Sequence, residues 1–245
     1  MPLIRAALLL LLLIPSAAAA QMPARVQSDA VVPGSPVLRP AEVREGVDTV
    51  GMVMTVNGRS LPIGMLVVET RRVTAPGGAP AVWRVETTTS RLVASTVDTF
   101  VVQMATLAAV SNRTHEDRVA ALDYAGGMVR GTIAEGGAVG RVEVPLPAPV
   151  FYDGAMDIVL GALPLADGYE AHLPVYDDEA GAVAWRLVRV AGSDSLPGEG
   201  GMADAWRVET SRGTTRSTYW MDKRTRRMLR WALPVAGGGE IRIVR

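Results

Sequence analysis

The chain has 245 residues, of which 49% are hydrophobic, 20% charged and 5% aromatic, with 25 basic and 25 acidic residues and no cysteine. A formal net charge of zero argues against a nucleic-acid-binding protein, because such proteins carry a strong basic excess. The absence of cysteine excludes disulfide bonds, thiolate zinc sites, iron–sulfur clusters and a cysteine nucleophile.

The first twenty residues have the features of a secretory signal peptide. Arg5 supplies a positive charge, residues 6–14 form an unbroken apolar run, and small residues lead up to Ala20. The run is shorter than the roughly 20 apolar residues that a bilayer-spanning helix needs. We expect cleavage after Ala20 and a soluble periplasmic protein without a stable membrane span.

Residues 21–46 contain four prolines and no apolar periodicity, which predicts an extended leader or linker. From residue 47 to residue 245 we expect a single domain of antiparallel strands, because apolar and polar residues alternate and turn residues interrupt them at short intervals. Asn57-Gly58 is the strongest hairpin signal, since both residues tolerate a positive φ. The predicted strands are 47–56, 61–73, 81–90, 96–109, 112–124, 128–134, 138–144, 169–175, 182–190, 203–210, 214–221, 228–235 and 240–244.

One segment departs from the strand pattern. Apolar residues recur at helical spacing from Tyr152 to Leu163, with Asp153 near the start and Pro164 at the end. About a dozen strands cannot lie flat with two open edges and an uncovered apolar face. We therefore predict a mainly β fold, in which a large curled antiparallel sheet forms an incomplete barrel plugged by one amphipathic helix.

The pentapeptide Trp-Arg-Val-Glu-Thr occurs at both 83–87 and 206–210. Two interpretations remain open. Strands with one buried and one wet face use a small set of residue types, with Trp and Val inside and Arg and Glu outside. Alternatively, a half-sheet has been duplicated. The first interpretation places Trp83, Trp185 and Trp206 on inward faces.

No group of residues predicts catalysis or a bound cofactor. Only two histidines are present, His115 and His172, and a metal site needs three or four ligands. No G-x-S-x-G turn is available to position a nucleophilic serine. The paired glycines at 136–137 and 237–239 separate strands, so they do not indicate a phosphate-binding loop. We expect neither an enzyme nor a metal site.

Flexible apolar residues are common, since ten methionines remain after removal of the leader. Methionine suits irregular cores, and it also suits pockets that adapt to variable apolar ligands. The mouth of a half-barrel is where such a ligand would enter if side chains do not fill it. The candidate ligand-contacting residues are Trp83, Met104, Met156, Leu160 and Trp206.

Charge is unevenly distributed along the second half of the chain. Residues 151–204 carry ten acidic side chains against two arginines, and residues 207–245 carry ten basic side chains against three acidic ones. The two surfaces either neutralise each other or leave a basic patch that meets an anionic partner in the envelope. The candidate partner-binding residues are Lys223, Arg224, Arg226 and Arg227.

The C-terminal segment carries a combination of short motifs. Trp206 and Val208 form a W-x-V strand, Tyr219-Trp220-x-Asp222 ends the next strand, and residues 224–230 follow as a basic return strand. This pattern resembles a family of exported bacterial proteins of unknown function, which are similar to the periplasmic carriers of lipoproteins. The resemblance implies an unclosed antiparallel β-barrel that is lidded by helices and holds acyl chains, and it implies no catalytic residues.

Two function classes follow from the sequence. In the first, a soluble, non-enzymatic envelope protein binds or carries a lipid or another apolar ligand in its half-barrel. In the second, the barrel is filled, and the protein is a structural or interaction module of the envelope that uses its basic C-terminal hairpin as the partner surface.

Overall fold

The structure is a computed structural model that describes residues 29–39, 45–90, 95–115, 118–177, 180–198, 200–235 and 238–244. The predicted signal peptide lies outside these residues. Within the described ranges, no helix has the length and apolarity that a membrane-spanning helix needs.

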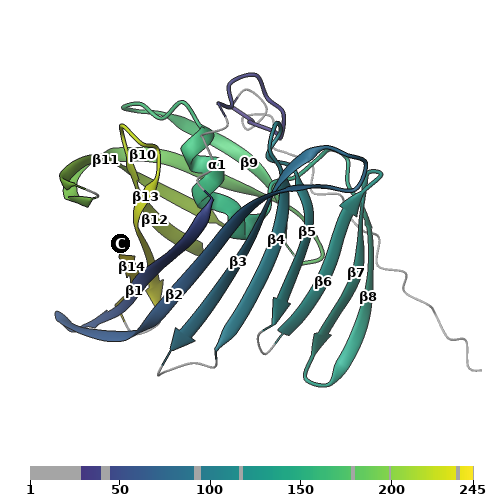
Figure 1. Cartoon of the computed structure of the whole chain (residues 1–245), viewed down its shortest axis with the longest axis horizontal. Helices are drawn as coiled ribbons and strands as arrows, with labels where there is room; N and C mark the ends of the chain where they lie inside the picture. Colours follow the sequence, from purple (N-terminus) through teal and green to yellow (C-terminus); the bar gives the residue numbers. More distant parts are fainter. Residues whose placement is uncertain are drawn as a thin grey trace, which may run out of the picture.

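In the described part of the chain, fourteen strands form one antiparallel sheet in the order β8-β7-β6-β5-β4-β3-β2-β1-β14-β13-β12-β11-β10-β9 (Figure 1). The edges are therefore β8 and β9, which follow each other in sequence, and the sheet is not closed. The strands are β1 (Gly46–Val56), β2 (Arg59–Thr74), β3 (Pro80–Ser90), β4 (Thr96–Gln103), β5 (Ala109–His115), β6 (Arg118–Ala125), β7 (Met128–Glu135), β8 (Ala138–Pro145), β9 (Glu170–Asp177), β10 (Ala182–Gly198), β11 (Gly201–Arg212), β12 (Thr215–Asp222), β13 (Met228–Val235) and β14 (Gly239–Val244).

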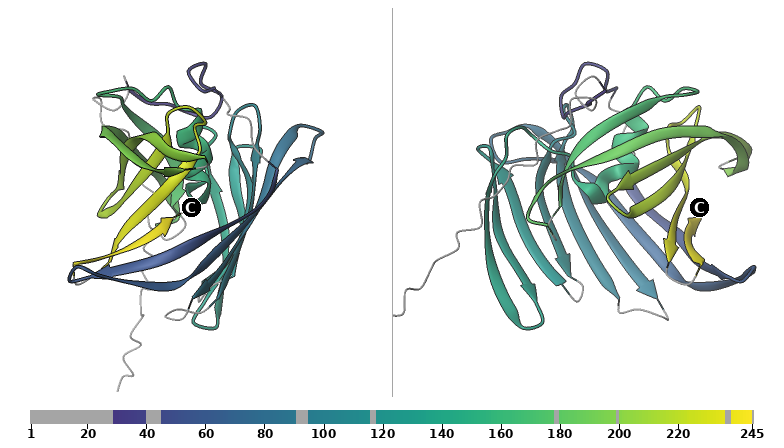
Figure 2. Two further views of the ribbon diagram at one scale, coloured as in Figure 1. Left: turned by 60° about the vertical axis from the view of Figure 1, so that its left-hand side comes forward. Right: turned by 180° about the vertical axis from the view of Figure 1, so that it is seen from behind.

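The sheet bends into two walls, β1–β8 and β9–β14, and the helical segment between β8 and β9 lies between them (Figure 2). Bulges interrupt several strand pairs, for example between Met52 and Val53 of β1, and bulges increase strand twist. Gly131 of β7 has φ +154°, and a Cβ at this position would lie 1.9 Å from the carbonyl oxygen of Ala121. This glycine permits a backbone geometry that other residues could not adopt. The predicted incomplete barrel is confirmed.

Most predicted strands agree with the observed ones to within about two residues, but β10 extends to Gly198 and not to residue 190, and the region between residues 96 and 124 differs. The Asn57-Gly58 turn is present, with φ values of 50° and 74°. The prediction of two strands at 96–109 and 112–124 is wrong, because the chain forms three, β4, β5 and β6. The turn after β4 contains Leu107 at φ 60° and no glycine, proline or asparagine, so composition gives no signal for it.

The predicted helix is present but short. A 3-10 turn at Asp153–Ala155 leads into α1 (Met156–Ala162), and the chain becomes extended at Leu163, immediately before Pro164. The N-cap residue of the 3-10 turn is Tyr152, which makes no side-chain capping hydrogen bond, and Asp153 is the acidic residue of the first turn. The carboxylate of Asp153 contacts the sheet, as described below.

Residues 29–39, the described part of the predicted leader, pack against the domain. The backbone N–H of Val31 donates to the carbonyl of His172 in β9 at 2.9 Å, and the N–H of Arg39 donates to the carbonyl of Ala162 at 2.8 Å. Val31 and Leu38 are buried in the core around α1. This segment therefore satisfies part of the edge of β9 and covers one end of the helix.

Register pairs define the concave face of the sheet, since directly paired residues point to the same side. One continuous row crosses six strands on the inner face and consists of Met52, Ile243, Trp231, Tyr219, Val208 and Val190. All six members belong to, or pack against, the buried apolar clusters. The core of the protein lies along this concave face.

The two Trp-Arg-Val-Glu-Thr segments present opposite faces to the interior. In β11, Trp206 packs on the core and Val208 is fully buried, as expected. In β3, Arg84 is buried and Trp83 is paired with exposed Arg71, so Trp83 points outward. The prediction of an inward tryptophan is wrong for Trp83 and also for Trp185, because its neighbour Arg186 is the buried residue. The two copies are not equivalent in the walls, which favours shared strand composition over duplication.

Candidate functional site

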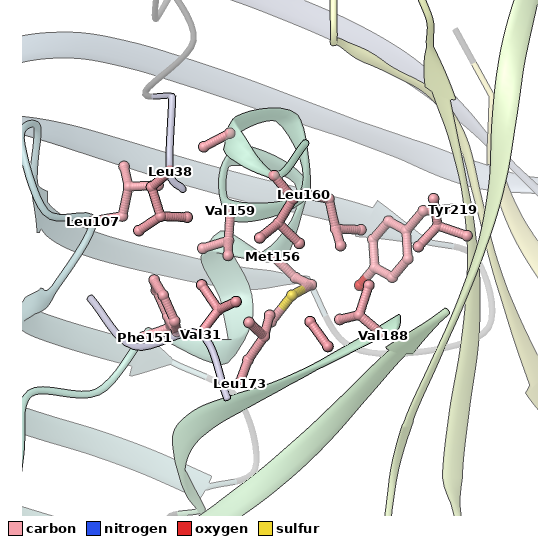
Figure 3. Packing of buried hydrophobic residues seen from close by; sticks show 14 of the residues in the cluster. Val31, Leu38, Leu107, Phe151, Met156, Val159, Leu160, Leu173, Val188 and Tyr219 are labelled. Atoms are coloured by element: carbon pink, nitrogen blue, oxygen red, sulfur yellow. The ribbon is translucent and has the colours of Figure 1, made fainter. Parts of the chain in front are cut away.

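The interior around α1 is an apolar core of buried side chains. Met156, Val159 and Leu160 of the helix are at most 1% exposed, and they pack between Phe151 and residues of β9–β12 (Figure 3). Val31 and Leu38 complete this cluster from the N-terminal segment. The helix therefore plugs one end of the half-barrel, and its apolar residues serve as core.

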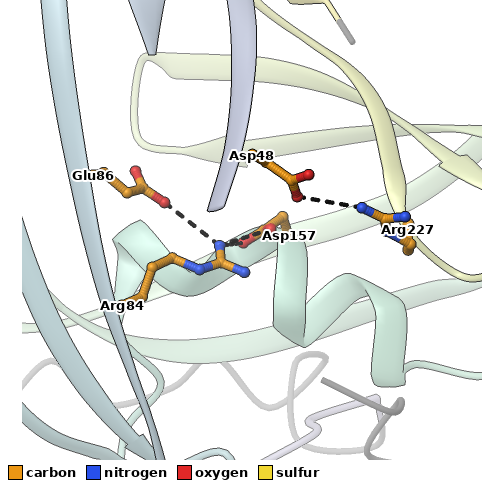
Figure 4. A network of polar contacts seen from close by, with 5 residues as sticks. All are labelled: Asp48, Arg84, Glu86, Asp157 and Arg227. Carbon is orange, nitrogen blue, oxygen red and sulfur yellow. Dashed lines mark hydrogen bonds and ion pairs between the residues drawn. The ribbon is translucent and has the colours of Figure 1, made fainter. Parts of the chain in front are cut away.

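A buried ion pair ties α1 to the first wall. Nη1 of Arg84 in β3 donates to both carboxylate oxygens of Asp157, each at 2.8 Å (Figure 4). The carboxylate of Glu86 lies 3.4 Å from the same nitrogen. Burial would lower the pKa of Arg84, but the charges of Asp157 and Glu86 outweigh burial and raise that pKa. The guanidinium therefore stays charged inside the barrel.

A second ion pair ties the 3-10 turn to the other wall. Nη2 of Arg186 in β10 donates to Asp153 at 2.5 Å, and Nη1 of Arg186 donates to the hydroxyl of Thr210 at 3.0 Å. Arg212 of β11 lies 3.8 Å from Asp153 and contacts Asp177 of β9. The helical segment thus carries two carboxylates, Asp157 and Asp153, that form ion pairs with arginines on opposite walls of the sheet.

Glu86 occupies an unusual environment for a carboxylate. Burial raises the pKa of Glu86 to about 7, against the partial opposition of the Arg84 charge, and the nearby carboxylates of Asp157 and Asp98 raise it further. Burial also raises the pKa of Tyr219, whose ring lies in the core. Near neutral pH, the protonated and the ionised forms of the Glu86 carboxyl group are therefore both populated.

Replacing Glu86 with glutamine should stabilise the protein at pH 8 by about 2 kcal/mol, with little effect at pH 4. Because the pKa of Glu86 is higher in the folded state than the ordinary value of 4.5, the folded state binds this proton more tightly. Its contribution to the free energy of unfolding is present below pH 4.5 and is lost as the pH rises through about 7. Urea unfolding at several pH values measures this dependence.

The matched control for this prediction is Glu143→Gln, because Glu143 is about half exposed and its ion pairs with described residues are to the exposed Arg130 and Arg141. This control should leave the pH dependence between 5 and 7 unchanged. An identical pH dependence for Glu86→Gln and the unmodified protein would contradict the assignment.

A second apolar cluster on the concave face contains strand residues only. Its buried members, from β1, β2 and β14, are Val50, Met52, Ile63, Leu66 and Ile243. Met54, Val68, Trp231 and Ile241 pack against these residues and are half-buried. Among the described residues of this cluster, none comes from α1. We call these nine residues the concave strip. Trp231 also packs against the core around α1, so the strip adjoins that core.

The basic turn at 223–227 is packed against the end of α1. Nη1 of Arg226 donates to the carbonyl of Leu163 at 2.8 Å, and the ammonium of Lys223 lies 3.9 Å from the centre of the Trp206 ring. A Cβ at Gly161 would lie 2.7 Å from the carbonyl oxygen of Arg226, so the close approach depends on this glycine. These basic side chains therefore have intramolecular contacts.

Two cavities adjoin this turn. A cavity of about 190 Å3 lies below it, and Leu160, Met221 and Trp206 form part of its lining. A larger cavity of about 390 Å3 lies on the other side, between the start of β1, the tip of the β10–β11 hairpin and the turn. Asp222 contributes to the lining of both cavities.

The structure brings three of the five predicted ligand-contacting residues together. Met156, Leu160 and Trp206 lie in or against the core around α1. Met104 packs on a separate cluster near Phe100, and Trp83 lies on the outer face. None of the five lies in the concave strip.

His115 is exposed at the end of β5, whereas His172 lies in β9. Among the described residues, no three histidine, aspartate or glutamate side chains are grouped so that they could hold a metal ion.

A family model described as a protein of unknown function (DUF3108) matches residues 52–244, which is most of the chain. The chain belongs to this family. The match runs from the middle of β1 to the end of β14 and includes the helical segment. No curated protein matches the sequence of this DUF3108 protein.

Solved structures with similar folds share little sequence with this DUF3108 protein. A β-barrel-like protein of the DUF1849 family from Brucella abortus is 11% identical, with a TM-score of 0.49, over 81% of this chain and 94% of that chain. The hypothetical lipoprotein YmcC from Escherichia coli is 11% identical, with a TM-score of 0.34, over 83% and 88% of the two chains. An exported protein with a YmcC-like fold from Bacteroides fragilis is 10% identical, with a TM-score of 0.36, over 85% and 96%.

Sequence reasoning missed the buried charges and the concave strip. Asp153 and Asp157 are one helical turn apart in an otherwise apolar segment, and this spacing is the signal that could have indicated buried partners. Trp231 and Met54 carry no comparable signal, because only the register of β1, β14 and β13 brings them to the same cluster.

Proposed function

We propose that this DUF3108 protein is a soluble, exported component of the bacterial envelope that binds a lipid or another apolar molecule on its concave face, without catalysing a reaction. The observation that carries this proposal is the concave strip. The strip is an inward-facing apolar cluster that contains no residue of α1 and adjoins the core around the helix through Trp231. Concave apolar surfaces with a few polar groups at their borders are the usual form of small-molecule sites.

The residue types in the strip suit a ligand of variable shape. Met52 and Met54 are flexible and polarizable, and the Trp231 ring stacks on Tyr219 with 6.1 Å between ring centres. Leu61, the register partner of Met54, is 60% exposed. The apolar surface therefore continues toward solvent at the β1–β2 hairpin, where a ligand could enter.

The sequence supports the envelope location, since its first twenty residues have the features of an export signal. The alternative of an interaction module with a basic partner surface is less well supported. Lys223 and Arg226 each contact another part of the same chain, so these two side chains are already engaged within the molecule.

Quenching of tryptophan fluorescence tests the proposal, with a dibrominated stearyl alcohol as the probe because it is apolar and uncharged. The delipidated protein should show saturable quenching, since bromine atoms near Trp231 would quench it. Trp231→Phe should lose at least half of that quenching. Trp83→Phe makes the same change on the outer face and should retain it.

Thermal unfolding of both variants confirms that they are folded before quenching is compared. Absence of saturable quenching in the unmodified protein would contradict apolar binding. Equal quenching in Trp231→Phe and the unmodified protein would place the ligand away from the concave strip.

A further inference from the structure

In the part of the chain that the structure describes, β14 ends at Val244, the last described residue. Val244 in β14 is paired with Gly51 of β1 on one side and with Arg230 of β13 on the other. β1 extends beyond this pair to Gly46. The larger cavity, about 390 Å3, lies where β1 and β13 continue past the Val244 pairs, and Val50 and Leu229 contribute to its lining.

One face of this cavity is apolar. Val50, Pro197 and Leu229 contribute to its lining. Val50 is 4% exposed and belongs to the concave strip, whereas Leu229 belongs to the cluster under the β10–β11 hairpin. The cavity therefore adjoins the concave strip through Val50.

The other face contains two arginines together with the acidic residues Asp48 and Asp222. Arg224 and Arg227 both contribute to the lining. Nη2 of Arg227 lies 3.3 Å from Oδ2 of Asp48, so its charge is partly compensated. Arg224 is exposed, and its guanidinium makes no ion pair with any residue that the structure describes.

We propose that this cavity binds the anionic head group, carboxylate or phosphate, of an amphiphile whose apolar tail reaches the concave strip through Val50. This inference rests on the proposed function and names the chemical class of the ligand. Arg224 is the primary contact of the head group, and Arg227 is the second.

The two acidic residues of the cavity, Asp48 and Asp222, do not cancel the preference of the cavity for an anion, because both carboxylates already have partners. Oδ1 of Asp222 accepts hydrogen bonds from the backbone N–H groups of Arg224 and Thr225, at 2.8 and 2.6 Å. This arrangement holds the turn so that Arg224 borders the cavity. A guanidinium binds carboxylate and phosphate through paired hydrogen bonds, which matches the proposed head group. The volume lies within the range of small-molecule sites, about 300–1,000 Å3.

Calorimetric titration with myristate and with 1-tetradecanol tests the site, since the two probes have equal chain lengths and differ in the charge of the head. Arg224→Ala should weaken myristate binding about tenfold and leave tetradecanol binding unchanged. Arg216→Ala is the matched control, because Arg216 is exposed on β12 and lies outside the cavity lining. The control should bind both probes like the unmodified protein.

The outcomes separate this inference from the proposed function. Equal myristate binding by Arg224→Ala and by the unmodified protein overturns the head-group site, while the proposed function stands. Failure of both probes to bind overturns the proposed function and this site with it. Tetradecyl phosphate and inorganic phosphate distinguish the sources of the anion. Arg224-dependent binding of inorganic phosphate as tight as that of tetradecyl phosphate overturns the amphiphile and assigns a free anion instead.

Discussion

Replacing Asp157 with asparagine should lower the free energy of unfolding by about 3 kcal/mol, because it leaves the buried Arg84 guanidinium without its main counter-charge. Arg84 is 10% exposed and donates two 2.8 Å hydrogen bonds to Asp157. The loss should be larger at pH 5.5 than at pH 8, since Glu86, with its pKa of about 7, is neutral at the lower pH and cannot take over. Urea unfolding at both pH values measures the difference.

Asp123→Asn is the matched control for this substitution. Asp123 pairs with Arg113 at 2.7 Å, but its side chain is 60% exposed, and exposed pairs contribute at most about 1 kcal/mol. A double replacement of Arg84 and Asp157 by leucine should be less damaging than Asp157→Asn, because it removes both buried charges. Equal losses for Asp157→Asn and Asp123→Asn would show that burial of the pair does not matter.

Leu160→Ala should cost about 3 kcal/mol of stability, through lost apolar burial and the cavity left behind. Leu160 is fully buried in α1, where it packs in the core between the walls. The sequence suggests Leu160 as a ligand contact, and in the structure Leu160 is buried in the core around α1. The substitution should therefore lower the thermal unfolding midpoint and leave the affinity for an apolar probe unchanged within about twofold.

Leu61→Ala makes the same chemical change at a position that is 60% exposed, and should cost less than about 0.5 kcal/mol. A comparison of thermal unfolding and probe affinity for the two variants separates core packing from ligand contact. If Leu160→Ala strongly lowered the affinity for the apolar probe without lowering the thermal unfolding midpoint, Leu160 would be a ligand contact.

Most of the secondary structure could be predicted from patterns between residues that are close in sequence. Alternation defined most strands, Asn57-Gly58 defined a hairpin, and Pro164 ended the helix. The turn after β4 could not be predicted, because Leu107 adopts a positive φ that its side chain does not favour. Local patterns were insufficient wherever the tertiary structure sets the conformation.

The face of each strand could not be predicted from local sequence. The same five residues place tryptophan inside in β11 and arginine inside in β3. The difference arises because Asp157 of α1 supplies a partner for Arg84, which allows a charged residue on the concave side. The concave strip likewise depends on the pairing of β1 with β14, which joins distant parts of the sequence.

The pairing of β1 with β14 also has a consequence for how the protein folds. Every other neighbouring pair in the sheet joins strands that are consecutive in sequence, so each wall can form from hairpins as the chain emerges. The walls become one sheet only when β14, the last described strand, finds β1, and this non-local step carries the highest loop-closure entropy. Until then, the concave strip is split between two unjoined halves, and its apolar residues are exposed to aggregation. Refolding should therefore be limited by the rate at which the two halves associate.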